Sequence, residues 1–403
     1  MYNKKAGIGN KRVLEHKLVS LRREIHQYPE LGNEEVQTSA LISRFLETHG
    51  VKVLKLNPTG LIGTVKGKGK PGKKVRTVVL RADIDALPIQ EHTSHGFVSK
   101  IQGKMHACGH DANTAIVAGA AVLLSEQSEK FGGTARFVFQ PNEEGSTGAR
   151  NVVSSGQLDN PKTDVIMGVH VSPSLPVGTI GVKYGAMFAA VDKLEIMITG
   201  EGGHAAYPHK GQDLVVAAAE IVQELQTIVS RKMDPTDSVV VTIGTINGGT
   251  RWNVLASEVK MTGTIRCFSD DVLNKVRAEL RGIVTRVCSK WHAKFVIKNN
   301  KSSSPLINNE KVAAFIVDSL ENSGIVDVRV IDKPSMGGED FSVYLNHYPG
   351  CFVYAGTGNN AKPATLHQWH HSRFDIDEKG IRPAAEALAY VVRQMLVKGG
   401  SFV

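Results

Sequence analysis

The chain has 403 residues, of which 41% are hydrophobic, and it carries a formal net charge of +9. This length predicts two domains, or one large domain with an insertion, and the composition is typical of a globular protein. No apolar run approaches the ~18 residues that a bilayer-crossing helix needs, so no membrane-spanning segment is expected.

The lysines and arginines are dispersed, and their densest run is KGKGKPGKK at residues 66–74. Its Gly and Pro residues indicate a solvated hairpin tip, and no basic face interleaved with aromatic residues accompanies it. We therefore expect no nucleic-acid partner. The N-terminal residues lack the apolar core of a signal peptide, and the four cysteines are widely scattered. A cytoplasmic protein without a disulfide framework is therefore expected.

Helix and strand patterns alternate through the first 170 residues. Helical periodicity ends where Pro29 and Gly32 break it, and an Ala-rich helical segment follows His110. The predicted helices are residues 11–27, 34–48 and 111–125, and the predicted strands are 52–56, 61–66, 74–81, 134–140 and 163–169. This alternation favours an α/β sandwich around a mostly parallel sheet.

The pattern then changes to strand, helix, strand, strand, helix, strand, which is the order of a ferredoxin-like unit. Its predicted strands are residues 191–199, 239–246, 258–268 and 294–298, and its helices are 213–230 and 270–289. The polar stretch 299–304 is expected to close this unit. The α/β pattern resumes with helices 309–323 and 377–397 and strands 328–331 and 351–355. We predict a discontinuous α/β domain of residues 1–187 and 301–403, interrupted by a ferredoxin-like domain of residues 188–300.

The segment MHACGHDANTA, residues 105–115, sets His106, Cys108 and His110 at alternate positions. On extended backbone such positions point the same way. A thiol and imidazoles packed this closely suit a zinc-like or manganese-like ion. The alternative is a buried cysteine beside surface histidines.

Other polar side chains follow the predicted strands in the same manner, and active sites of open α/β sheets lie beyond the carboxyl ends of the strands. These side chains are Asp83 and Asp85, the cluster 106–110, Glu143 and Glu144, and His170. Their coincidence predicts a shared metal site with room for two ions. Near the C-terminus, His367, His370 and His371 can reach the same site or form a surface cluster, and spacing alone does not rank them.

Glu143 and Glu144 suggest a division of labour, because adjacent side chains project differently. One can bind metal while the other takes a proton from the metal-activated water. The alternative is a pair of surface acids at a helix start. In the insertion, His204 follows two glycines and suits an oxyanion donor or an ordinary turn histidine. Asn253 and Arg266 each suit a substrate carboxylate, or a plain turn or strand position.

Together these stretches resemble the zinc-type amidohydrolase and exopeptidase family that includes aminoacylases and carboxypeptidase G-like enzymes. The closer match is its N-acyl-amino-acid amidohydrolase branch, which holds hippurate hydrolases and plant auxin-conjugate hydrolases. The matching motifs run collinearly from Arg22 to Glu378 and include RREIHQYPELGNEE, RADIDALPIQE, MHACGHDAN, FVFQPNEEGSTGA, GVHVSP, GGHAAYPHKGQD, GTINGGTRWNV, SMGGEDFS and LHQWHHSRFDIDE.

The resemblance implies a role for each matching residue. The implied metal ligands are Cys108, in a bridging position, His110, Glu144, His170 and His370. Glu143 matches the general base, and His204 matches a histidine that polarises the scissile carbonyl, often from the partner subunit. Asn253 and Arg266 match positions suspected of binding the substrate carboxylate, and Asp85 and Asp111 resemble groups that orient ligands.

Two positions depart from the family pattern. Ser372 replaces the proline of the terminal motif, so the register rests on counting back from Phe374, which selects His370 over its neighbour His371. Thr114 stands where a histidine is usual.

The resemblance implies a hydrolase of N-acyl amino acids that uses metal-activated water and a Glu general base. It further implies two divalent ions per subunit (Zn, Mn, Co or Ni) and a homodimer in which the inserted domain serves as lid and dimerisation domain. A dipeptidase or carboxypeptidase of the same family, and a non-catalytic binding relative, are the alternatives.

Overall fold

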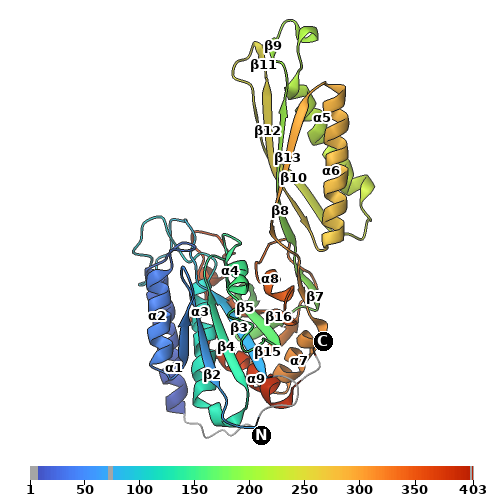
Figure 1. Cartoon of the computed structure of the whole chain (residues 1–403). Coiled ribbons are helices and arrows are strands. Elements are labelled where there is room, and N and C mark those ends of the chain that lie inside the picture. The colour runs from blue at the N-terminus through green and yellow to red at the C-terminus, as the bar shows by residue number, and fades with distance from the viewer. Residues whose placement is uncertain (1–7, 71–75, 400–401, 403) are drawn as a thin grey trace. The chain divides into compact units, whose positions relative to one another are not determined.

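The computed structural model describes residues 8–70, 76–399 and 402. The chain divides into a larger unit, Met1–Gly185, Ile307–Lys333 and Val343–Val403, and a smaller unit, Ala186–Leu306 and Pro334–Ser342 (Figure 1). Residues 334–342, which the sequence analysis placed in the α/β domain, thus group with the smaller unit. Residues 71–75, which include the end of the predicted hairpin tip and the start of the predicted strand 74–81, lie outside the described residues.

The larger unit is built on an eight-stranded sheet with the order β1-β2-β4-β3-β5-β16-β6-β15. Its strands are β1 (Lys52–Lys55), β2 (Leu61–Lys66), β3 (Thr77–Asp83), β4 (Thr134–Gln140), β5 (Val165–Pro176), β6 (Thr179–Val182), β15 (Asp327–Val330) and β16 (Gly350–Gly358). The pairings β3–β4, β3–β5, β5–β16 and β6–β15 are parallel, and the other three are antiparallel. The predicted mostly parallel sheet is confirmed.

A layer of helices around α3 buries the hydrophobic core of this unit. The helices of the unit are α1 (Ile8–Gln27), α2 (Val36–Glu47), α3 (His110–Glu126), α4 (Gly148–Ser154), α7 (Glu310–Glu321), α8 (Ser342–Leu345) and α9 (Ile381–Lys398). In α3, 14 of the 17 residues are buried. A Cβ at Gly119 would lie 2.6 Å from Leu18 of α1 and 2.9 Å from Ala385 of α9, so the glycine permits close helix packing. Within the described residues, no helix is long and apolar enough to cross a bilayer.

Two strands extend beyond their predicted ends. We expected a strand to end at Val169 with His170 just beyond it, but β5 continues to Pro176 and pairs His170 with Tyr354 of β16. The polar stretch 299–304 was expected to close the insertion, yet β13 reaches Ser303 and pairs Asn299 with Leu194. Both expectations were wrong because backbone hydrogen bonds to a neighbouring strand form whatever the side-chain polarity.

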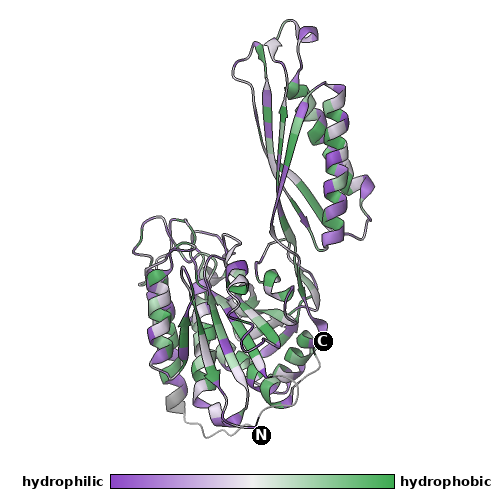
Figure 2. Cartoon of the chain, viewed as in Figure 1, coloured by the Kyte–Doolittle hydropathy of each residue, from purple (hydrophilic) through white to green (hydrophobic). Residues whose placement is uncertain are grey.

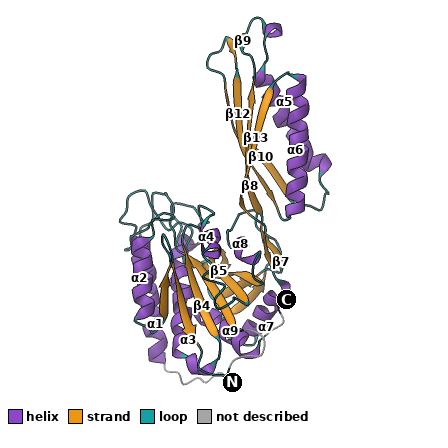
Figure 3. Cartoon of the chain, viewed as in Figure 1, coloured by secondary structure: helices purple, strands orange, loops and turns teal. Residues whose placement is uncertain are grey.

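The smaller unit has the predicted ferredoxin-like order, with an antiparallel sheet β10-β12-β8-β13. Helices α5 and α6 lie on one face of this sheet (Figure 3). The elements are β8 (Ala190–Thr199), β9 (Gly203–His204), α5 (Leu214–Thr227), β10 (Val239–Gly248), β11 (Val254–Leu255), β12 (Glu258–Cys267), α6 (Asp270–Lys290) and β13 (Lys294–Ser303). The short strands β7 (Gly185–Phe188) and β14 (Leu306–Asn308), which lie where the chain enters and leaves this unit, pair with each other. Figure 2 shows hydrophobic and hydrophilic segments alternating along α6, as expected for a helix with one buried face.

A buried carboxylate also joins α6 to the sheet of this unit. Asp192 of β8 is fully buried and accepts two hydrogen bonds from Arg277 of α6, at 2.7 and 2.8 Å. Asn299 of β13 donates a third, at 3.0 Å. These contacts compensate the loss of hydration of the buried charge.

Candidate metal centre

A glycine turn precedes the first residue of α3, His110. Gly109 has a φ of 92°, and a Cβ there would lie 2.4 Å from Val171 Cγ2, so the turn requires glycine. The expectation that His106 shares a site with Cys108 and His110 was wrong. The His106 ring lies 6.3 Å from the His26 ring, and among the described residues it joins none of the donor groups that surround Cys108.

Two groups of potential ligands meet at Cys108. One comprises Cys108, His110 and His170, the other Cys108, Glu144 and His370, and within each group the ligand atoms lie within 4.8 Å of one another. Cys108 Sγ lies 3.4 Å from His170 Nε2, and His370 Nε2 lies 3.2 Å from Glu144 Oε1. The structure thus brings together all five side chains that the resemblance implied as ligands, with the thiol shared by both groups.

Backbone carbonyls orient two of the imidazoles. His110 Nδ1 lies 2.8 Å from the carbonyl oxygen of Asp85, and His170 Nδ1 lies 2.8 Å from that of Val171. Because a carbonyl can only accept, each Nδ1 carries a proton, and in the neutral ring each Nε2 presents a lone pair. His110 Nε2 is buried and meets no hydrogen-bond partner in the described part of the chain. This orphaned acceptor fits a metal ion.

The charges of the site also fit a bound cation. Burial raises the pKa of the Cys108 thiol well above its usual value, although nearby His110 opposes this rise. Burial lowers the pKa of His170 to about 4, which keeps the ring neutral and able to bind metal. Since a buried thiolate is unfavourable without nearby positive charge, the donor set is chemically suited to divalent ions.

The two glutamates are presented by a tight turn after β4. Asn142 and Ser146, on either side of the pair, both have positive φ values, 53° and 55°. The backbone N–H of Glu144 donates to Asp85 Oδ2 at 3.0 Å, which fixes the turn to the segment after β3. Glu143 forms a third donor group with His110 and Glu144. Its carboxylate therefore lies where it could exchange a proton beside the ligands.

His370 occupies a strained backbone conformation. Its φ is 65°, and its N–H donates to the carbonyl oxygen of Ala107 at 2.8 Å, next to Cys108. The interaction of its side chain with Glu144 raises the pKa of His370. His371 instead stacks on His367, with ring centroids 4.4 Å apart. The geometry therefore places His370 among the candidate ligands. Counting back from Phe374 in the sequence selected the same histidine.

Of three supporting residues, Asp83 was predicted as part of the site, whereas Asn113 and Trp369 were not. Asp83 Oδ2 lies 3.7 Å from His110 Nε2, and Asn113 donates to Asp83 at 2.7 Å while accepting from the N–H of Val171 at 2.8 Å. Asn113 lies three residues after His110, a spacing that puts both on one helix face and could have revealed it. Trp369 packs edge-on against His170, with centroids 5.4 Å apart.

The remaining predicted residues have other surroundings. Asp111 accepts from Arg22 Nε at 2.7 Å and contacts His26 Nδ1 at 2.8 Å, so its expected role toward the ligands stays a prediction. His204, Asn253 and Arg266 belong to the smaller unit. There, His204 pairs with Val254, and the N–H of Ala205 donates to the carbonyl oxygen of Asn253 at 3.1 Å. Their roles toward the metal centre are likewise predictions.

A pair of variants separates the adjacent histidines. We expect His370→Ala to lower the bound divalent metal by about one ion per chain, because one donor group loses its imidazole. His371→Ala should leave the metal content unchanged. Elemental analysis after gel filtration measures both, and circular dichroism verifies folding. Equal metal content in the two folded variants would contradict the assignment of His370.

Comparison with known proteins agrees with this geometry. Residues 79–394 match the model of the peptidase family M20/M25/M40. The chain is 39% identical over 389 residues to N-acetyl-L-cysteine deacetylase of Bacillus subtilis. This alignment covers 96% of this chain and 90% of that protein. It is 35% identical to thermostable carboxypeptidase 1 of Saccharolobus solfataricus, with coverages of 94% and 95%.

A solved structure agrees as well. A dinuclear metal-binding peptidase of the M20 family from Bacillus subtilis superimposes with a TM-score of 0.83 at 34% identity, covering 96% of this chain and 99% of the other. The family model and these relatives span nearly the whole chain, including every element that carries a candidate ligand. The chain therefore belongs to the M20/M25/M40 peptidase family, as its motifs predicted, and is a metallo-amidohydrolase.

Proposed function

We propose that this protein hydrolyses the amide bond of N-acyl amino acids and uses two divalent metal ions. The observation that carries the proposal is the meeting of two donor groups at Cys108 with Glu143 beside them. The deacetylase relative supports an N-acyl substrate, and the dinuclear neighbour supports two ions. When bound, the ions would supply Lewis acidity toward water and the amide carbonyl.

Glu143 would act as the general base and then as the general acid. Its carboxylate takes a proton from the attacking water and delivers it to the leaving amine nitrogen. Glu144 differs, because its side chain interacts with His370 while its backbone N–H is held by Asp85. The pair therefore divides into one proton carrier and one ligand.

His204 would stabilise the negative charge that develops on the carbonyl oxygen. The N–H of Ala206 donates to His204 Nδ1 at 3.1 Å, so the neutral ring carries its proton on Nε2. This exposed ring is therefore a ready donor toward an oxyanion. Arg266 and Asn253 would hold the substrate carboxylate, for which a guanidinium and an amide are suitable partners.

We further propose a homodimer in which His204 acts on the metal centre of the partner subunit. Trp252, next to Asn253, is 90% exposed, and Tyr207 is 52% exposed. Large exposed side chains near His204 support an interface with a second copy at this end of the smaller unit.

A substrate panel tests the proposed reaction. Chelated enzyme should regain hydrolysis of N-acetyl amino acids or hippurate when zinc, manganese, cobalt or nickel is added, because the donor set requires an ion. Faster hydrolysis of free dipeptides, or faster release of C-terminal amino acids from peptides, would favour the dipeptidase or carboxypeptidase alternative. The carboxypeptidase of Saccharolobus solfataricus supports this alternative. No turnover of any substrate by folded, metal-loaded protein would leave the non-catalytic alternative.

The role of Glu143 has its own variant. Glu143→Gln keeps the shape of the side chain but removes its basicity, so kcat should fall by about 10²–10⁴-fold. Its metal content should equal that of the wild type, since Glu143 is not assigned as a ligand. Activity within a few-fold of the wild type would exclude Glu143 as the base.

Mixing two inactive variants tests the shared site. Glu143→Gln and His204→Ala chains, unfolded together and refolded, should form mixed dimers in which one of the two centres is intact. Random pairing in a two-fold dimer predicts recovery of about a quarter of the wild-type activity. Recovery no greater than the sum of the separately refolded variants would show that His204 does not act between subunits.

A further inference from the structure

A second histidine–carboxylate cluster lies in the larger unit, away from Cys108. It contains His26 of α1 with Glu91 and His95 of the segment after β3, and their ligand atoms lie within 4.8 Å of one another. His26 Nε2 and His95 Nε2 each lie 3.3 Å from Glu91 Oε1. None of the three residues belongs to the donor groups around Cys108, and the proposed reaction does not use them.

With a neutral His26, the hydrogen bonds of this cluster leave it one positive charge short. The Asp111 carboxylate only accepts, so the proton that joins it to His26 resides on Nδ1, and Nε2 of a neutral His26 carries a lone pair. That lone pair faces Glu91 Oε1, which is itself an acceptor. His95 Nε2 faces the same oxygen and lies 3.2 Å from Thr93 Oγ1, whose hydroxyl donates to Glu91 Oε1. Buried His95 Nδ1 meets no hydrogen-bond partner among the described residues. A second proton on His26 would satisfy its contact with Glu91, and so would a metal cation among the three groups.

The distances suit a tetrahedral ion. In a tetrahedron with metal–nitrogen and metal–oxygen bonds of about 2.0–2.1 Å, neighbouring ligand atoms lie about 3.3 Å apart. The two measured separations from Glu91 Oε1 have this value. A hydrogen bond of such length would be weak.

We propose that His26, Glu91 and His95 form a separate zinc-binding site. Asp111 orients His26 through Nδ1, which is the carboxylate–histidine–metal arrangement that fixes a ligand ring. Phe97 stacks on His95 with centroids 3.8 Å apart and an interplanar angle of 13°, which fixes the second ring. The N–H of Ser99 donates to Glu91 Oε2 at 2.6 Å and leaves Oε1 directed at the histidines.

The surrounding charges allow a divalent ion. Buried Arg22 is paired with Asp111 at 2.7 Å, Glu378 at 3.2 Å and Asp375 at 3.4 Å, and Glu378 also pairs with Arg23 at 2.6 Å. With Glu91, four carboxylates face two arginines. When both histidines are neutral, the cluster therefore carries two excess negative charges, which one zinc ion would balance.

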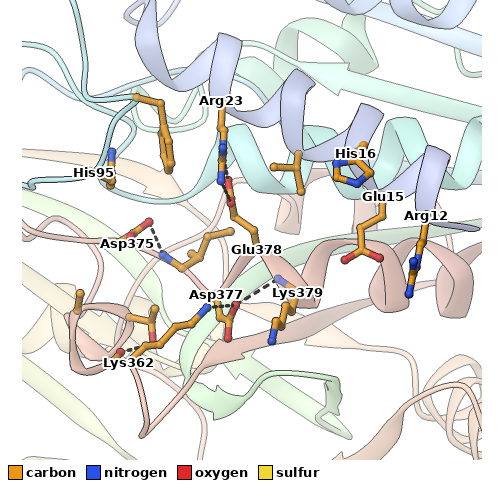
Figure 4. Close-up of a pocket in the computed structure, with 15 residues that line it drawn as sticks. Arg12, Glu15, His16, Arg23, His95, Lys362, Asp375, Asp377, Glu378 and Lys379 are labelled. Atoms are coloured by element: carbon orange, nitrogen blue, oxygen red, sulfur yellow. Dashed lines mark hydrogen bonds and ion pairs between the residues drawn. The ribbon is translucent and has the colours of Figure 1, made fainter.

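An ion can also reach the cluster. His95 lines a cavity of about 830 Å³ together with Arg23, Phe97 and Asp375. Figure 4 shows His95, Arg23 and Asp375 among the residues that line it. Three protein ligands leave one position for water on a tetrahedral ion. Bound zinc would join α1 to the segment 91–99, so it should stabilise the larger unit. This proposal does not depend on the reaction at Cys108.

Zinc content tests the site in the full-length protein. We expect His95→Ala to bind about one zinc ion per chain less than the wild type. His16→Ala is the matched control, because His16 is an exposed histidine that lines the same cavity. It should retain the wild-type zinc content. Equal zinc in His95→Ala and the wild type would overturn the proposal.

A second measurement separates this site from the metal centre. The double variant Cys108→Ala/His170→Ala removes a shared ligand and leaves His26, Glu91 and His95 intact. Titrated with cobalt(II), it should show the visible absorption of a tetrahedral ion without a thiolate charge-transfer band, because the site contains no sulfur. Adding His95→Gln should abolish this absorption. Its absence in the double variant, folded by circular dichroism, would overturn the proposal whether or not the protein hydrolyses amides.

Discussion

The first turn of α3 is the constraint on which the polar interior of the larger unit depends. His110 presents its Nε2 atom to the candidate metal centre, Asp111 binds Arg22 and His26, and Asn113 joins Asp83 to the backbone of Val171. Because all three side chains leave one rigid turn, the ends of β3 and β5 and the helix α1 are positioned by the same backbone. Burial of α3 among its neighbours, with Gly119 against Leu18 and Ala385, holds that turn in place.

Burial makes this arrangement demanding, since charged groups removed from water need compensation. Asp83 obtains it within the protein: burial would raise its pKa, but His110 and Arg81 outweigh this effect and lower the pKa to about 2. At Cys108, burial outweighs the effect of the same histidine and raises the pKa of the thiol. Arg81 and Asn113 also donate hydrogen bonds to the Asp83 carboxylate, whereas a thiolate at Cys108 would need an added positive ion. This difference in compensation distinguishes a supporting residue such as Asp83 from a candidate ligand such as Cys108.

The sequence predicted much of this site because its residues follow strand ends in compact motifs. The pairs Asp83–Asp85 and Glu143–Glu144 lie where the parallel sheet brings its carboxyl edges together, and Phe374 gave the register that selects His370. What failed depended on contacts between distant residues. Periodicity could not show that β5 continues past His170, because its pairing with β16 involves residues over 180 positions away. Nor could spacing reveal that His26 meets Glu91 and His95, or that His106 lies beside His26 and apart from the donor groups at Cys108.

The two clusters differ in chemistry as well as in place. The candidate centre at Cys108 combines a thiol with imidazoles and carboxylates, and a sulfur ligand would favour zinc, cobalt or nickel over harder ions such as manganese. The cluster at Glu91 offers only nitrogen and oxygen, from two imidazoles and a carboxylate. Both are joined to α3, one through His110 and the other through Asp111, so an ion in either cluster would restrain the same helical turn. The same helical turn therefore supports both clusters, although their candidate ligands differ. The metal preferred at Cys108 need not be the metal preferred at Glu91.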